Sequence, residues 1–197
     1  MMIERKETFN RIIEKLKTKK ITKIDKKPSF LGIETYEVKL NNGKIIKREK
    51  IIKNKKDGNA VIIMALTKDN EVILTIEPRV FTKETVTIGF PSGYIEENEN
   101  EISAALRELK EEVGYIPEKL IHLKKYYQDE GCSSALNHIF LALNCEQKEK
   151  QHLDKDEYIE YVLCKEEELE YLIENDYILG VNALLTYHEV KKIRKEK

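Results

Sequence analysis

The chain has 197 residues, of which 41% are hydrophobic and 36% charged, and its formal net charge is −1. This length suits one compact domain with a proper core, alone or with a small accessory unit. A net charge so close to zero gives no global field that would attract nucleic acid or an acidic membrane surface. No run of apolar residues approaches the length of a membrane span. We therefore expect a soluble globular protein with neither a nucleic-acid nor a membrane partner.

The cysteines and the N-terminal segment bear on the compartment. Cys132, Cys145 and Cys164 show neither paired nor metal-ligand spacing, and an odd number without a CxxC motif is typical of free thiols in a reducing environment. The first twenty residues carry charges throughout and contain no apolar stretch of the kind found in signal peptides. The sequence therefore predicts a cytoplasmic protein.

The first 57 residues are predicted to form a small unit containing one helix and one β-hairpin. Phe9, Ile12 and Leu16 recur at helical spacing among Lys and Glu, which indicates an amphipathic helix over residues 3–16. Two strand patterns then flank Asn41-Asn42-Gly43, whose residues tolerate the positive φ of a tight hairpin turn. A charged stretch ends this unit, and we expect a second domain from residue 58 to residue 197.

The second domain is predicted to mix strands and helices. Apolar runs bounded by turn residues indicate strands, and longer runs with helical periodicity indicate helices. The expected strands, including the two of the hairpin, cover residues 32–40, 44–52, 60–66, 72–76, 85–90, 120–127, 138–143 and 158–164. The expected helices of this domain cover residues 99–113, 166–174 and 180–192. This order favours an α/β fold with a mixed sheet between helices.

The helix over residues 99–113 is the most informative segment of the chain. A capping box is expected at its start, with Asn98 as the N-cap and Glu101 three residues later. Gly114 suits the position after its last turn. The predicted buried face carries apolar residues, namely Ile102, Ala105, Leu106, Leu109 and Val113.

Three glutamates share one face of the same helix. Glu108, Glu111 and Glu112 stand at i, i+3 and i+4, with the small Ala104 on their face. Like charges at this spacing repel, and a hard divalent cation removes that repulsion because carboxylate oxygens are the ligands that Mg²⁺ and Mn²⁺ prefer. Arg107 lies beside Glu111 and is expected to orient it through a charge-assisted hydrogen bond. The pattern suits metal-assisted phosphate chemistry, although an acidic surface helix would show it too.

A wider motif contains this helix. From Gly93 to Tyr115 the chain reads GYIEENENEISAALRELKEEVGY. This segment resembles the signature of the Nudix hydrolase family at every fixed position, and Tyr115 stands where the family usually has an aliphatic residue. The resemblance implies hydrolysis of a nucleoside diphosphate derivative with Mg²⁺ or Mn²⁺. It also implies a set of metal ligands, namely Glu108, Glu111, Glu112 and the backbone carbonyl of Ser92 or Gly93.

More of the chain resembles the ADP-ribose pyrophosphatase branch of that family. The segments that carry this likeness are Asn42-Gly43, Arg48-Glu49, Ile76-Glu77-Pro78-Arg79 and Phe90-Pro91-Ser92-Gly93. In that branch the N-terminal hairpin packs across a homodimer and helps to build the substrate pocket. The resemblance therefore implies a homodimer, with Tyr36, Arg48 and Glu49 as substrate-binding candidates. Arg79 is the best candidate for a phosphate contact, because a guanidinium matches phosphate oxygens bidentately.

One loop departs from this branch. About fifteen residues after the motif the branch usually has a Pro-Gly pair followed by an acidic residue. Here Glu130 replaces the proline and Ala135 stands about where the acid would fall, so that Asp129 or Glu130 would have to supply the carboxylate. Two functions therefore stay open: an active hydrolase of ADP-ribose or a nucleotide sugar, and a nucleotide-binding module that has lost turnover.

Overall fold

The structure, a computed structural model, describes residues 2–22, 30–53 and 56–195. Its helices are α1 (Met2–Leu16), α2 (Glu101–Val113), α3 (Glu166–Glu174) and α4 (Val181–Lys195). Its strands are β1 (Leu31–Lys39), β2 (Ile45–Lys53), β3 (Ala60–Thr67), β4 (Val72–Pro78), β5 (Val86–Gly89), β6 (Ser92–Tyr94), β7 (Tyr115–Ile116), β8 (Lys119–Tyr127), β9 (Leu136–Gln147) and β10 (Glu160–Cys164). The elements confirm the expected mixed α/β fold; β6 and β7 have no counterpart among the predicted strands.

A mixed sheet forms the centre of the molecule. Its main path runs β10-β4-β3-β9-β7, while β5 pairs with β4, β6 with β3 and β8 with β9. The β3–β9 pair is parallel and the other pairs are antiparallel. β3 and β4 are apolar almost throughout because both of their faces are covered, which is the pattern of an interior strand.

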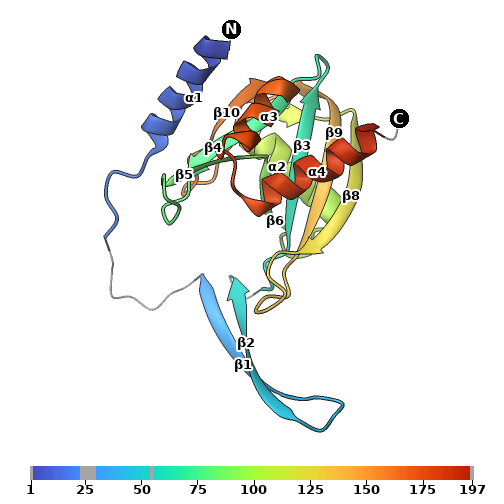
Figure 1. Cartoon of the computed structure of the whole chain (residues 1–197). Helices are drawn as coiled ribbons and strands as arrows, with labels where there is room; N and C mark the ends of the chain where they lie inside the picture. Colours follow the sequence, from blue (N-terminus) through green and yellow to red (C-terminus); the bar gives the residue numbers. More distant parts are fainter. Residues whose placement is uncertain (1, 23–29, 54–55, 196–197) are drawn as a thin grey trace.

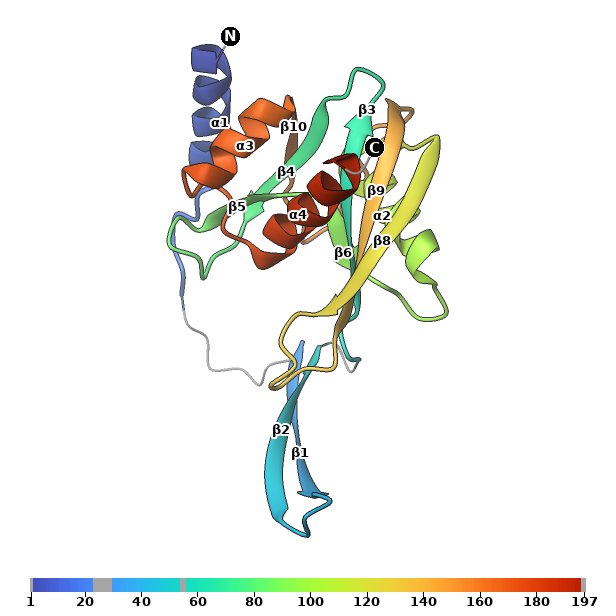
Figure 2. The same ribbon diagram turned by 45° about the vertical axis from the view of Figure 1, so that its right-hand side comes forward.

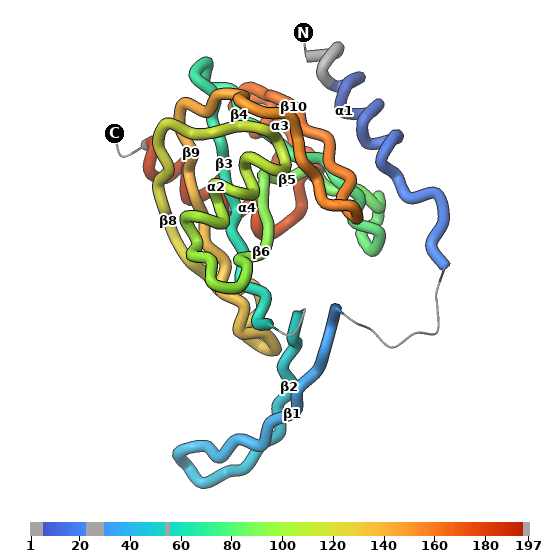
Figure 3. The backbone as a smooth tube through the Cα atoms, turned by 180° about the vertical axis from the view of Figure 1, so that it is seen from behind, coloured from blue at the N-terminus to red at the C-terminus, as the bar shows by residue number. Residues whose placement is uncertain are grey.

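Helices cover both faces of this sheet (Figures 1 and 3). On one face Ala105 and Leu109 of α2 pack against Val61 and Ile63 of β3. On the other face α1, α3 and α4 share a larger core with the alternate residues of β3 and β4. The sheet is therefore the middle layer of three, with α2 covering one face and the other three helices the opposite one.

The N-terminal helix belongs to the main core. Phe9, Ile12 and Leu16 are buried in the same cluster as residues of β4, α3 and α4. This confirms the predicted amphipathic helix. Helix and hairpin do not lie together, because α1 packs beside β4 and the hairpin extends from the opposite end of the molecule (Figure 2). The division of the chain at residue 57 stays a prediction.

The hairpin β1–β2 forms a separate two-stranded sheet. Tyr36 pairs with Arg48 in its register, and the turn closes where Asn42-Gly43 predicts it, with Gly43 at φ 81°. Its residues are almost all exposed or only half-buried. A backbone hydrogen bond from the Ile51 N–H to the Cys132 carbonyl (2.8 Å) joins β2 to the body of the molecule.

The start of α2 differs from the prediction. Asn100, not Asn98, is the N-cap, and its side chain accepts a hydrogen bond from the Ser103 N–H (2.9 Å). Asn98 instead adopts a left-handed conformation (φ 63°) in the preceding turn, a conformation that asparagine tolerates. The predicted N-cap was therefore wrong by two residues, and with it the capping box that paired Asn98 with Glu101. The C-terminal prediction is confirmed, since Gly114 caps the helix at φ 75°.

The buried face of α2 is also rotated from the predicted one. Ile102 and Leu106 are exposed, whereas Ala104 is buried beside Ala105. The buried stripe runs on through Glu108 and Glu112, so two charged residues lie on the inward side of the helix. Apolar periodicity alone does not predict this, because it assigns charged side chains to solvent.

Two smaller expectations concern cysteines and membranes. Cys132, Cys145 and Cys164 all carry free thiols, as their spacing predicts. Within the described residues, no helix has both the length and the apolar character needed to cross a bilayer.

Candidate active site

The chain entering α2 lies close against this helix at Gly93. β6 pairs with β3, and Ile63 donates its N–H to the Pro91 carbonyl (2.9 Å), which fixes the path of this loop. A Cβ placed on Gly93 would lie 2.0 Å from Oε1 of Glu108 and 2.1 Å from its Cδ. Glycine therefore leaves the space in which the Glu108 carboxyl lies against the loop backbone.

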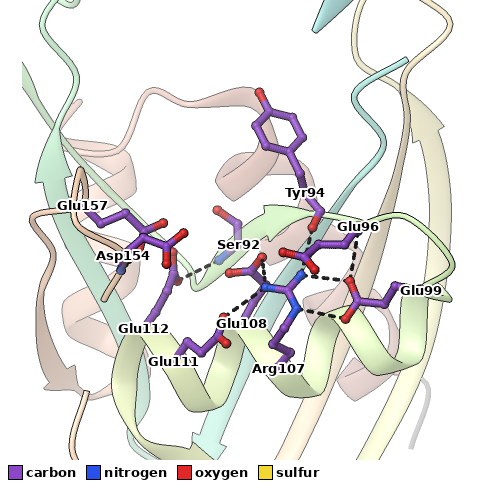
Figure 4. A network of polar contacts seen from close by, with 10 residues as sticks. All are labelled: Ser92, Tyr94, Glu96, Glu99, Arg107, Glu108, Glu111, Glu112, Asp154 and Glu157. Carbon is purple, nitrogen blue, oxygen red and sulfur yellow. Dashed lines mark hydrogen bonds and ion pairs between the residues drawn. The ribbon is translucent and has the colours of Figure 1, made fainter. Parts of the chain in front are cut away.

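Arg107 holds the loop and the acidic helix together (Figure 4). Its Nε and Nη2 each donate to Glu99 at 2.9 Å, and Nη2 also donates to the Tyr94 carbonyl at 3.0 Å. Nη1 donates to Glu108 at 2.7 Å and to Glu111 at 3.0 Å. The expected contact with Glu111 is therefore present, and one guanidinium fixes three carboxylates. The hydrogen bonds to Glu99 raise the pKa of Arg107 further above its ordinary value, with the charge of Glu108 adding to this effect.

Glu108 and Glu112 are buried carboxylates, only 7% and 5% exposed. Burial raises the pKa of Glu108 to about 7, against the lowering effect of Arg107. Burial also raises the pKa of Glu112 well above its ordinary value, and the charge of Glu108 adds to this. One of its oxygens accepts a hydrogen bond from the Ser92 N–H (3.0 Å). Burial therefore disfavours the ionised form of both carboxyl groups, and their mutual charge adds a smaller contribution at Glu112.

The donor set fits a hard divalent cation. Carboxylate oxygens and a nearby backbone carbonyl are the ligands that Mg²⁺ and Mn²⁺ prefer, and Mg²⁺ needs few protein ligands because it keeps several waters. In the present side-chain conformations, the described residues contain no group of three or more Asp, Glu, His or Cys side chains arranged to bind a metal ion. Arg107 instead pairs with one oxygen of Glu108 and one of Glu111, which leaves the second oxygen of each carboxylate available as a ligand.

A pocket of about 1220 Å³ opens over this helix. Acidic side chains from five segments line it: Asp57 before β3; Glu77 on β4; Glu96, Glu97 and Glu99 on the loop before α2; Glu108, Glu111 and Glu112 on α2; and Asp154, Asp156 and Glu157 on the loop between β9 and β10. Figure 4 shows Asp154 and Glu157 beside Glu112. The charge of Glu157 contributes to the raised pKa of Glu77, Glu108 and Glu112.

The acids of the β9–β10 loop are the residues that sequence reasoning missed. The loop is tied to the C-terminal half of α2, where His152 donates its N–H to the Glu111 carbonyl (2.9 Å) and the Gln151 side chain donates to the Glu112 carbonyl. The signal in the sequence was the acidic run just before β10. A run of loop acids is usually a solvated surface, so only the fold distinguishes this one.

Arg79 lies in the same pocket. It follows β4, lines the pocket and forms an ion pair with Glu77 (2.7 Å). Ser92 and Gly93 line the pocket as well, so their backbone is beside the acidic helix, where the sequence places it. The structure thus brings Arg79, Ser92 and the α2 glutamates together around one cavity.

The other predicted substrate-binding residues lie elsewhere within a single chain. Tyr36, Arg48 and Glu49 are on the projecting hairpin and do not line the pocket; the Tyr36 hydroxyl donates to Glu34, and Arg48 to the Lys47 carbonyl. Glu130 is exposed in the loop between β8 and β9, and it does not line the pocket either. Their roles in substrate binding stay predictions.

Known proteins resemble this chain over most of its length. The NUDIX domain family matches residues 56–179. An ADP-ribose pyrophosphatase of Bacillus subtilis (strain 168) is 34% identical over 157 residues, which cover 77% of this chain and 82% of the relative. A methanol dehydrogenase activator of Bacillus methanolicus is 29% identical over 144 residues, or 72% of this chain and 75% of the relative.

The structural similarity covers still more of the chain. A crystal structure of an ADP compounds hydrolase superposes with a TM-score of 0.70 at 26% sequence identity. The superposition covers 89% of this chain and 98% of that one. The match therefore includes segments outside the region that the domain family covers.

Proposed function

The chain belongs to the Nudix hydrolase family, and on that premise we propose that it cleaves the pyrophosphate bond of a nucleoside diphosphate derivative, ADP-ribose first among them, with Mg²⁺ or Mn²⁺. One observation carries the proposal: carboxylates of β4, α2 and the β9–β10 loop line a single pocket that also contains Arg79. The two similar proteins whose names mention ADP-ribose or ADP compounds support the substrate class.

In this proposal, separate residues of the chain bind the metal, orient its ligands and bind the phosphate. Glu108, Glu111 and Glu112, with the Ser92 or Gly93 carbonyl, hold the metal. A divalent ion bound there supplies charge neutralisation for the pyrophosphate and lowers the pKa of a water. Arg107 orients two of the glutamates, and Arg79 binds a phosphate oxygen through its guanidinium.

Proton acceptance is assigned to the β9–β10 loop. Glu157 lines the pocket and lies beside Glu112, on the side away from Arg107 (Figure 4). A carboxylate so placed can take the proton of an attacking water. The departures at Glu130 and Ala135 do not favour the inactive binding module, because this other loop supplies acids to the same pocket.

A substrate panel tests the proposed function. ADP-ribose, nucleotide sugars, dinucleotides and nucleoside triphosphates are each incubated with the full-length protein and Mg²⁺ or Mn²⁺. Phosphate release after coupling to a phosphatase is then measured. We expect turnover that needs the metal, stops with EDTA and is fastest for ADP-ribose. Binding of ADP-ribose without any turnover across the panel would instead favour the nucleotide-binding module.

We also propose that the protein is a homodimer assembled through the β1–β2 hairpin. A two-stranded hairpin is marginally stable alone, and this one exposes Ile33 (70%) and Ile45 (58%) to solvent. A second copy would cover these side chains and would bring Tyr36, Arg48 and Glu49 toward a pocket.

Substituting Ile33 by Asp tests this assembly. We expect the wild-type protein to elute as a dimer in size-exclusion chromatography with light scattering, and Ile33→Asp to shift it toward monomer, because a charge would be buried in the interface. The matched control is Ile102→Asp, another exposed isoleucine, in the first turn of α2 where an acidic residue suits the helix dipole. A monomeric wild type, or equal dissociation by both variants, would contradict the hairpin interface.

A further inference from the structure

An exposed aromatic ring lines the pocket beyond the glutamates of α2. Tyr94, the last residue of β6, lines the pocket and is 45% exposed. Its ring points away from α2, on which Arg107 and the three glutamates stand (Figure 4). Exposed aromatic surface is costly in water and is characteristic of places where a ligand covers it.

The backbone at Tyr94 is fixed relative to the acidic helix. Its carbonyl accepts a hydrogen bond from Nη2 of Arg107 (3.0 Å), the side chain that also binds Glu108 and Glu111. Its register partner is Ala60 on β3, a strand of the central sheet. The backbone that carries the ring is therefore held at a defined position with respect to the α2 glutamates.

The neighbours of the ring support its use as a stacking surface. Phe30, also half-exposed and pocket-lining, lies with its ring centroid 6.0 Å from that of Tyr94 and tilted by 52°. The ammonium of Lys53 lies over one face of the Tyr94 ring, 5.8 Å from the centroid, so this face has a cationic neighbour that a bound base would displace or leave for the other face. Burial raises the pKa of Tyr94, and the positive charge of Arg79 opposes this effect. Arg79, the proposed phosphate contact, is therefore close enough to Tyr94 to act on it electrostatically.

The pocket thus contains two aromatic rings and a lysine in addition to its acidic helix. Resting on the proposed function, we propose that Tyr94 stacks on the base of the bound nucleoside diphosphate derivative and so contributes to the choice of substrate. Every base presents a π-face, and stacking on an aromatic side chain accounts for about 1–3 kcal/mol per base. The ring would therefore favour substrates with a base over pyrophosphates without one.

Kinetics of two variants test this contribution. Tyr94→Leu removes the π-face but keeps an apolar side chain, so we expect KM for ADP-ribose to rise by about 5- to 150-fold with kcat little changed. Tyr94→Phe keeps the ring and should stay near wild type. An unchanged KM in Tyr94→Leu, in a variant whose melting temperature matches wild type, would overturn the proposal.

A single-tryptophan reporter measures the contact itself. The chain contains no Trp, so Tyr94→Trp introduces a unique fluorophore at the site. In the non-hydrolysing Glu112→Gln background with Mg²⁺, ADP-ribose should quench it and ribose 5-phosphate should not. The control is Phe81→Trp, since Phe81 is 94% exposed and does not line the pocket; its signal should not change.

Isothermal titration calorimetry of the same variants distinguishes failure of the stacking proposal from failure of the proposed hydrolase function. If calorimetry shows that ADP-ribose binds while the fluorescence of the Tyr94→Trp reporter stays constant, the stacking proposal is wrong and the proposed function stands. If wild type cleaves no member of the panel, yet ADP quenches the reporter, the hydrolase proposal fails and Tyr94 remains a base-binding residue. Equal quenching by ribose 5-phosphate would overturn the assignment of the base to this ring.

Discussion

Replacing Glu112 by Gln is expected to abolish measurable turnover and to leave the thermal stability of the protein nearly unchanged. The substitution removes a charge that would hold the metal. We expect kcat to fall by at least about 10²- to 10³-fold, the effect of losing one group that stabilises transition-state charge. Rates with saturating Mg²⁺ and ADP-ribose, together with melting curves, measure both effects.

The stability argument follows from the surroundings of Glu112. Gln has nearly the same shape, and its carbonyl oxygen can still accept the hydrogen bond from the Ser92 N–H. Because burial raises the pKa of Glu112, its ionised form is unfavourable inside the fold, and the neutral amide avoids that cost. A matched control is Glu118→Gln, outside the pocket, which should keep full activity. An active Glu112→Gln enzyme would rule out the proposed metal site.

Substituting Gly93 by Ala should cause the second large loss. The new methyl group would lie 2.0 Å from Oε1 of Glu108, so the flexible Glu108 side chain has to swing its carboxylate away from the position that it holds beside the loop. A displacement of about 1 Å in a catalytic group can cost about 10²-fold in rate. We expect a fall in kcat of that order, together with weaker binding of Mn²⁺ measured by electron paramagnetic resonance.

The control for this prediction is Gly89→Ala on β5. An added Cβ there meets no atom within 4 Å, so activity should stay within about twofold of wild type. The two variants differ in whether the new methyl group collides with Glu108. If both variants retained activity, the close approach at Gly93 would be irrelevant to catalysis.

Patterns confined to neighbouring residues allowed much of the fold to be predicted. The spacing of Phe9, Ile12 and Leu16 predicted α1, and Asn42-Gly43 predicted the hairpin turn. The N-cap of α2 was predicted wrongly, because Asn98 and Asn100 are both good N-cap residues and the choice between them depends on the loop that precedes the helix. There the Glu99 side chain accepts hydrogen bonds from the Glu96 N–H and from Arg107, which places the start of the helix after it.

The sequence by itself determined the acidic face of α2 and its motif, because residues at i, i+3 and i+4 share a helix face whatever the rest of the chain does. Only the tertiary structure decided that Glu108 and Glu112 face inward and that Asp154 and Glu157 lie beside them. It also decided that α1 joins the main core and that Tyr36, Arg48 and Glu49 on the hairpin do not line the pocket. These placements depend on packing and hydrogen bonds between segments far apart in the chain, such as the one from His152 to Glu111, and no local pattern encodes them.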